Sequence, residues 1–149
     1  MDLLQTPPAF NLYDDVWRIY ARNPIQPPHF MADTAVVDNA MITEGCDVAG
    51  AVRHSILFAG VHIEEGATVV DSAIRPGAVI KSGAVVTRAI VGEDSVISAG
   101  CVVGRPEVPG EDNRIALVGQ HTVLPENFVV NPGDQIDSDV LRLERSVDV

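Results

Sequence analysis

A six-residue repeat runs through the middle of this 149-residue chain, and no other feature limits the possible folds as strongly. Each copy has a turn residue, a small residue, any residue and then a β-branched aliphatic. The copies begin at Gly45, Gly66, Gly77, Gly83, Asp94 and Gly100. Apolar residues recur at the same interval, at positions 74, 80 and 86 and again at 91, 97 and 103.

A longer period lies over the short one. Two mostly aliphatic residues, two polar residues, a small residue and an apolar residue form a segment that starts at 36, 51, 69 and 85. Hexads nested in such a period predict an all-β fold, a parallel β-helix in which three hexads close one triangular coil. Hexapeptide repeats of this form resemble left-handed β-helices, and the resemblance implies that hand. The amphipathic helices that a βαβ fold needs between its strands do not occur in this sequence.

Alternate residues of a strand face opposite sides, so the aliphatic that opens each hexad should face the inside of the coil. The residues expected to face inward are Val48, Ile63, Val69, Ile74, Ile80, Val86, Val91, Ile97, Val103, Val118, Leu124 and Val130. Cys46 and Cys101 occupy the small inward position after a glycine. A thiol buried among apolar side chains is inert, so neither cysteine is expected to be catalytic or to bind metal.

Outward residues of successive coils should stack in the same way. The repeats place Asp38, Arg53, Asp71 and Thr87 in one column. Three of these four residues carry charges of alternating sign, which predicts a charge ladder on one face, worth about 0.2–1 kcal/mol per pair. Arg53 and Arg88 are therefore expected to be surface partners rather than anion ligands.

The chain divides into three stretches. Residues 1–34 hold five of the seven aromatic residues and five of the ten prolines, which predicts an irregular linker. Its aromatics should cover one end of the core or dock on another domain or subunit. The β-helix is expected over 35–136, interrupted by an exposed loop at 104–114, with Phe128 in a normally small inward position of the last coil. The acidic tail, 137–149, should pair as an edge strand or be disordered.

Composition excludes several classes of partner. The net charge of −11 argues against nucleic acid and acidic membranes, which need a basic footprint. No apolar run reaches the ~18 residues of a membrane span, and the N-terminal residues lack the basic-then-apolar order of a signal peptide. Two cysteines are too few for a disulfide framework. These features favour a cytoplasmic location.

The sequence contains few residues arranged as catalytic or metal-binding sites require. A zinc enzyme on a β-helix needs converging imidazoles, but the spacing of His54 and His62 places them on different faces. His121, just after the loop, is the best candidate for the histidine base of a hexapeptide acyltransferase. Nucleotide-binding glycine loops are absent from the sequence. We therefore assign no catalytic, cofactor or metal residue within this chain.

Several short segments carry a family resemblance. They are Met1-Asp-Leu-Leu4, Phe10-Asn-Leu-Tyr-Asp14, Trp17-Arg-Ile-Tyr20, Pro27-Pro28-His-Phe30, Ser55-Ile-Leu-Phe58 and Asp71-Ser-Ala-Ile74. In this order they resemble the C-terminal third of the glucose-1-phosphate adenylyltransferase (ADP-glucose pyrophosphorylase) family. The resemblance covers most of residues 1–103 and fades after the loop.

The resemblance implies a non-catalytic role in assembly and allosteric regulation. In the family, an N-terminal nucleotidyltransferase domain binds Mg-ATP and makes ADP-glucose from ATP and glucose 1-phosphate for glycogen synthesis. The implied partners are that domain and further copies of the chain, as a tetramer in the parent enzyme. The stretch comparable to the family's basic effector position, Gly119-Gln-His121, has no Lys or Arg. Effector or anion contacts would then fall to Arg18, Arg22 or Arg114. A hexapeptide acyltransferase and the β-helix of another sugar-nucleotide pyrophosphorylase remain the alternatives.

Overall fold

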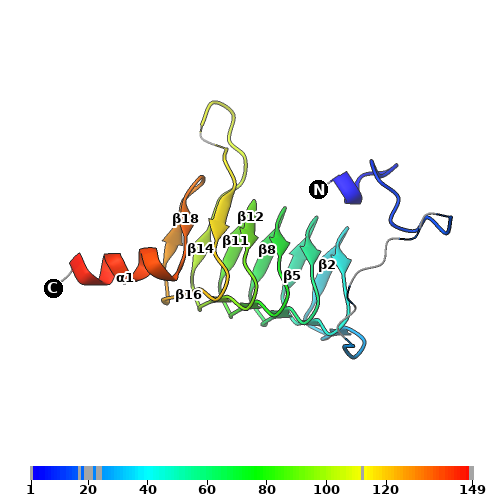
Figure 1. Cartoon of the computed structure of the whole chain (residues 1–149), viewed down its shortest axis with the longest axis horizontal. Helices are drawn as coiled ribbons and strands as arrows, with labels where there is room; N and C mark the ends of the chain where they lie inside the picture. The colour runs from blue at the N-terminus through cyan, green and yellow to red at the C-terminus, as the bar shows by residue number, and fades with distance from the viewer. Residues whose placement is uncertain (1, 17, 19–21, 23–24, 112, 148–149) are drawn as a thin grey trace.

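The computed structural model describes residues 2–16, 18, 22, 25–111 and 113–147. Two of the linker aromatics, Trp17 and Tyr20, lie outside these residues. Among the described residues before β1, the chain forms a short 3-10 helix, η1 (Asp2–Leu4), and no other helix or strand. Figure 1 shows η1 near the β2 end of a long, regular stack of strands.

The stack consists of short parallel strands in three six-stranded sheets. Sheet A contains β1 (Phe30–Met31), β4 (Asp47–Val48), β7 (His62–Ile63), β10 (Val79–Ile80), β13 (Val96–Ile97) and β16 (Val123–Leu124). Sheet B contains β2 (Val36–Asp38), β5 (Ala51–Arg53), β8 (Thr68–Val70), β11 (Val85–Thr87), β14 (Val102–Val103) and β17 (Val129–Val130). Sheet C contains β3 (Met41–Ile42), β6 (Ile56–Leu57), β9 (Ala73–Ile74), β12 (Ala89–Val91), β15 (Ala116–Val118) and β18 (Gln135–Ile136).

Consecutive strands always belong to different sheets, so the chain passes from A to B to C and back to A in each coil. We number these coils 1 to 6 in chain order. The all-β prediction of a parallel β-helix is confirmed, and the architecture is consistent with the left-handed hexapeptide form. Every strand pairs with the strand of the same sheet one coil away, which gives the prism its straight axis (Figure 1).

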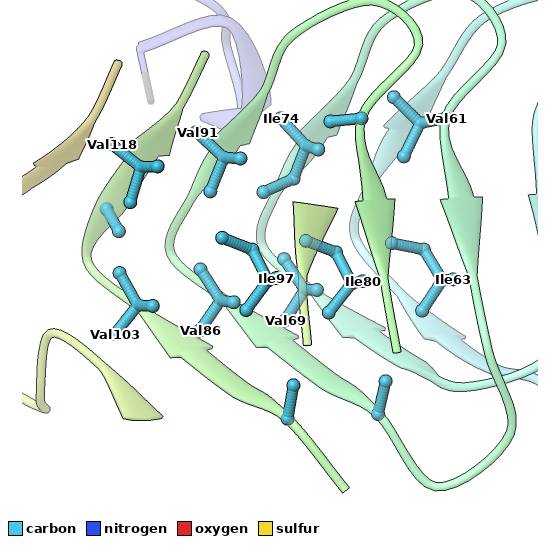
Figure 2. Packing of buried hydrophobic residues seen from close by; sticks show 14 of the residues in the cluster. Val61, Ile63, Val69, Ile74, Ile80, Val86, Val91, Ile97, Val103 and Val118 are labelled. Carbon is cyan, nitrogen blue, oxygen red and sulfur yellow. The ribbon is translucent and has the colours of Figure 1, made fainter. Parts of the chain in front are cut away.

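The interior of the prism is filled by aliphatic side chains. All twelve residues that the hexads place inside have exposed fractions of 3% or less. Figure 2 shows most of them, from Ile63 to Val118, as stacked rows that converge from the three sheets. Burial of this apolar surface is the main favourable term for the fold, at roughly 1.5–3 kcal/mol for each Val or Ile side chain.

Two buried serines link successive coils at the corner between sheets B and C. Ser72 donates a hydrogen bond from Oγ to the carbonyl of Val70 (2.7 Å) and accepts one at Oγ from the N–H of Ala89 (3.1 Å). Ser55 does the same one coil earlier, accepting from the N–H of Ser72 (3.1 Å). The corner is too tight for backbone pairing alone, and the hydroxyl supplies the missing acceptor.

Replacing Ser72 with alanine should therefore destabilise the fold. The substitution leaves the buried N–H of Ala89 without its acceptor, which costs about 1–3 kcal/mol. Ser82→Ala is the matched control, because Ser82 is exposed and such changes usually stay within about 0.5 kcal/mol. Urea titrations of the two variants measure the difference, and equal midpoints would contradict the role given to the Ser72 hydroxyl.

The predicted charge ladder is wrong at its third member, Asp71. Asp38 and Arg53 are direct partners, but Arg53 is in register with Val70 rather than Asp71, and Val70 with Thr87. Coils 2 and 3 are offset by 17 residues in sheet B, whereas the matching of similar segments implied 18. Asp71 lies one position further on, at the corner, where it meets His54 instead.

The C-terminal residues form a helix, which differs from the expected edge strand or disorder. The helix α1 (Ser138–Val147) follows β18 directly and projects beyond the last coil (Figure 1). The Asp137 carboxylate caps it, because Oδ1 accepts hydrogen bonds from the N–H groups of Asp139 (3.0 Å) and Val140 (2.9 Å). Val140 and Leu141 are partly buried against the core, as is Phe128 of the last coil. The sequence signal for the helix was this cap followed by two apolar residues.

Candidate functional site

Apart from the two cysteines, the ionisable side chains of the β-helix that are considered for function lie on the outside of the prism, at its corners and on the outward sides of its strands. Within the described residues, no set of three or more His, Cys, Asp or Glu side chains gathers closely enough to hold a metal ion. In the same part of the chain, no helix combines the length and apolar character needed to cross a membrane.

Three of the histidines face an aspartate from a neighbouring coil. His54 Nδ1 lies 2.6 Å from Asp71 Oδ1, His62 Nδ1 lies 3.4 Å from Asp47 Oδ2, and His121 Nδ1 lies 3.8 Å from Asp94 Oδ2. His54 and His62 lie at different parts of the coil, as their spacing predicts. The pairing with aspartates was missed because it depends on register between coils, and its only sequence signal is a spacing of about one coil.

His121, the candidate acyltransferase base, lies in an open groove. The groove has a volume of about 350 Å³ and is lined by His121, Val123, Ser138, Leu141 and Arg142. The side chain of His121 is 66% exposed. A general base works best where closure excludes water and holds the substrate, and this geometry offers neither.

The three candidate effector arginines are not brought together. Arg18 is exposed and lies 3.6 Å from Asp15 in the linker. The guanidinium of Arg114 lies against Gly133 in coil 6, where a Cβ atom would come within 2.7 Å of Cζ. Arg22 lines a groove against the prism.

The Arg22 groove has a volume of about 630 Å³ and follows the corner between sheets C and A. Its floor is a row of glycines, Gly45, Gly60 and Gly77, with φ between +70° and +71°. A side chain at Gly45 would collide with Gln26 of the linker, and one at Gly77 with the Asp94 carboxylate. Because Glu93 also lines the groove, Arg22 shares it with two carboxylates, and the arrangement is not a simple anion site.

Arg88 holds the inserted loop against the prism. Its Nη1 donates a hydrogen bond to Glu107 Oε2 (2.9 Å) and its Nη2 donates one to the carbonyl of Asn113 (2.8 Å). The Asn113 side chain in turn closes the loop by bonding both the N–H and the carbonyl of Val108, each at 2.9 Å. The loop therefore projects as a braced arm, visible in Figure 1 above the fifth coil. Arg88 is a surface partner, as predicted, but its partner is the loop.

Both cysteines are buried, with exposed fractions of 0–1%. Burial raises the pKa of the Cys46 and Cys101 thiols, since desolvation penalises the thiolate. Each Sγ donates a hydrogen bond to a backbone carbonyl, from Cys46 to Phe58 (3.1 Å) and from Cys101 to Pro125 (3.0 Å). Neither thiol has the exposure or the cationic neighbour of a reactive cysteine.

We expect both thiols to resist a disulfide reagent in the folded chain and to react once it unfolds. The raised pKa also makes stability depend on pH. Above the ordinary thiol pKa of about 8.5 the unfolded state loses protons that the folded state keeps. The free energy of unfolding should therefore fall as pH rises from 8 toward 10, and thermal melts measure it. A Cys46→Ala/Cys101→Ala variant should lose that part of the decline, and an unchanged slope would contradict the assignment.

Fold and surface together define a hexapeptide-repeat β-helix domain. The family described as "GlmU-like, C-terminal hexapeptide" matches residues 27–124, more than half of the chain. The chain therefore belongs to the GlmU-like C-terminal hexapeptide family.

Within this comparison, the chain is similar to proteins that carry an enzyme name. The chain is 49% identical over 77 residues to the glucose-1-phosphate adenylyltransferase of Bacillus thuringiensis (strain Al Hakam) and to that of Bacillus anthracis. It is 48% identical over 77 residues to the enzyme of the same name from Bacillus cytotoxicus. Each match covers 52% of this chain and 20% of the relative. The chain thus spans about a fifth of the length of these relatives, in their C-terminal part.

Proposed function

We propose that this chain is the non-catalytic C-terminal assembly and regulatory domain of a cytoplasmic glucose-1-phosphate adenylyltransferase. The parent reaction is ATP plus glucose 1-phosphate giving ADP-glucose and pyrophosphate, for glycogen synthesis. In this proposal Mg-ATP binds to the N-terminal nucleotidyltransferase domain, and this chain holds no cofactor. Identity of 49% to the C-terminal part of enzymes with that name supports the assignment.

The filled interior of the prism is the observation that carries the non-catalytic role. Inward positions are occupied by aliphatics and small residues with almost no exposed surface, so substrate has no enclosed site there. The two grooves described above, lined by Arg22 and by His121, are open and lie at the corners. Catalysis of phosphoryl or nucleotidyl transfer relies on converging charges or metals in a closed site, which this geometry does not provide.

The linker supplies the surface for the N-terminal domain. Phe10, Leu12, Tyr13 and Val16 are 48–98% exposed in the segment that precedes coil 1. Apolar side chains at this density on an irregular segment indicate a contact with another domain. Of the three candidate arginines, Arg22 is our choice for an effector contact, since it lines the groove at the corner between sheets C and A together with Gln26 of the linker.

Two assays test the proposal. The purified chain should not turn over ATP and glucose 1-phosphate, and it should release no thiol from acetyl-CoA. A chimera should be active when this chain replaces the corresponding C-terminal part of the Bacillus thuringiensis enzyme. The same enzyme truncated before that part is the control and should lose assembly or activity. Turnover by the isolated chain would overturn the non-catalytic role, and a chimera no better than the truncated enzyme would count against the family-specific role.

A further inference from the structure

The outward side of sheet B carries a column of mostly apolar residues that runs the whole length of the prism. Its central column is Val36, Ala51, Thr68, Val85, Val102 and Val129, each in direct register with the next. The four valines of this column are 38–55% exposed. Sheet A differs, because the corresponding column there contains the charged pair Asp47 and His62. The corresponding column of sheet C is also uncharged, but of its apolar residues only Ile90 is exposed, compared with four valines in sheet B. Asp38 and Arg53 are charged outward residues of this sheet in coils 1 and 2, but its strands carry no charge from coil 3 to coil 6. An uncharged and partly exposed surface of this kind on a chain of net charge −11 marks an interaction surface.

Charges lie along both edges of this face. On the edge toward sheet A, coil 3 carries Glu65 and coil 4 carries Lys81, both exposed. On the edge toward sheet C, coil 3 carries Asp71 and coil 4 carries Arg88. The edges thus repeat the same order of signs, negative in coil 3 and positive in coil 4.

We propose that sheet B docks face to face on sheet B of a second copy, about a twofold axis parallel to its strands between coils 3 and 4. The proposal rests on the assembly role given above and names the surface that serves it. In this arrangement coil 3 of one copy faces coil 4 of its partner, so Thr68 meets Val85 of the partner subunit. Coil 2 faces coil 5, where the small Ala51 meets the larger Val102 of the partner subunit.

Two twofold axes would bring the two copies of sheet B face to face, one parallel to the strands and one along the prism. The charges at the edges of the sheet favour the axis parallel to the strands. With the axis along the strands, Glu65 faces Lys81 of the partner subunit, and symmetry makes this contact twice. An axis along the prism would instead place Glu65 opposite Asp71 of the partner subunit and Lys81 opposite Arg88 of the partner subunit. Like charges brought together at an interface suppress that mode of association. With the favoured axis, Asp33 and Glu126 of the partner subunit meet as like charges at the solvent-exposed ends, where screening is strongest.

The position and charge of the inserted loop also favour the axis parallel to the strands. It leaves the prism from coil 5, at the edge of sheet B toward sheet C, and therefore reaches the level of coil 2 of the partner subunit. Arg53 of that coil is exposed, and the loop carries the exposed carboxylates of Glu107 and Glu111. The loop thus adds charge complementarity of the same sense as the central contact.

Sedimentation velocity of the full chain across a wide concentration range tests the proposal. The wild type should sediment as a dimer, and Val85→Arg should weaken it on the order of a hundredfold, since it places a charge at the twofold axis. Val123→Arg is the matched control, an equally outward valine on sheet A that is 58% exposed, and it should leave the dimer unchanged. Circular dichroism and melting curves should show both variants folded.

Exchanging the charges of Glu65 and Lys81 tests whether sheet B docks about this twofold axis rather than in another arrangement. Lys81→Glu alone should weaken the dimer about tenfold, and adding Glu65→Lys should restore it. A monomeric wild type, a dimer indifferent to Val85→Arg, or a double variant no tighter than Lys81→Glu would each overturn the proposal. These outcomes leave the turnover and chimera assays unaffected, so failure of the interface is distinguishable from failure of the proposed function.

Discussion

Replacing Ile80 with aspartate will unfold the chain. Ile80 lies in coil 4 with no exposed surface, directly between Ile63 and Ile97 of the coils on either side. An aspartate there would be surrounded by aliphatic side chains with no partner, a situation that costs several kcal/mol whether the carboxyl stays charged or takes up a proton. The loss is comparable with the whole stability of a typical domain, about 5–15 kcal/mol.

Val79→Asp is the matched control for this experiment. Val79 precedes Ile80 in the same strand but points outward, in register with His62 and Val96. The two variants add the same carboxylate to the same strand and differ only in the side of the sheet on which it lies. Far-ultraviolet circular dichroism should show a folded, cooperative melt for Val79→Asp and none for Ile80→Asp. A cooperative melt near the wild-type temperature for Ile80→Asp would refute the inward assignment.

The reason that Ile80 could be placed from sequence is that inward and outward positions have different chemistry. A six-residue repeat contains whole strand periods, so every copy presents an aliphatic at the same inward position. A shift of one residue in the strand register would turn all of these aliphatic side chains toward solvent. Only one register therefore buries the aliphatic residue of every copy. The inward residues therefore followed from the sequence, from Val48 to Val130, although their partners did not.

The register between coils depends on corner lengths, which carry a weaker signal. The corner between sheets A and B has two residues in coil 2, Ala49 and Gly50, but four in coil 3, from Glu64 to Ala67. Aligning the segments by residue type alone did not account for this difference in corner length. The alignment gave an offset of 18 residues instead of 17 and so placed Asp71 beside Arg53. The pairing of Asp71 with His54 and the anchoring of the loop by Arg88 depend on the same register, so neither was accessible from sequence.

The second large effect is expected at the base of the inserted loop, from Gly104→Ala. Gly104 has φ +68° and is buried, and its N–H donates a hydrogen bond to the carbonyl of Val130 in coil 6 (2.8 Å). A Cβ atom at this position would overlap the carbonyl oxygen of Thr87 in coil 4. Because backbone lies on both sides, the neighbours cannot yield without separating coils. We expect a loss of about 3–5 kcal/mol, the range of severe packing substitutions.

Gly110→Ala separates the steric term from the conformational one. Gly110, at the tip of the loop, also has a positive φ of +82°, but no atom lies within 4 Å of the position of a Cβ. An alanine there bears only the cost of the left-handed conformation, about 1–2 kcal/mol. Thermal melts should therefore show a much larger fall for Gly104→Ala than for Gly110→Ala, by roughly 2–4 °C for each kcal/mol that separates them. Equal falls would mean that the loop can leave the prism without disturbing the stacking of coils 4, 5 and 6, and that its braced geometry contributes little to the fold.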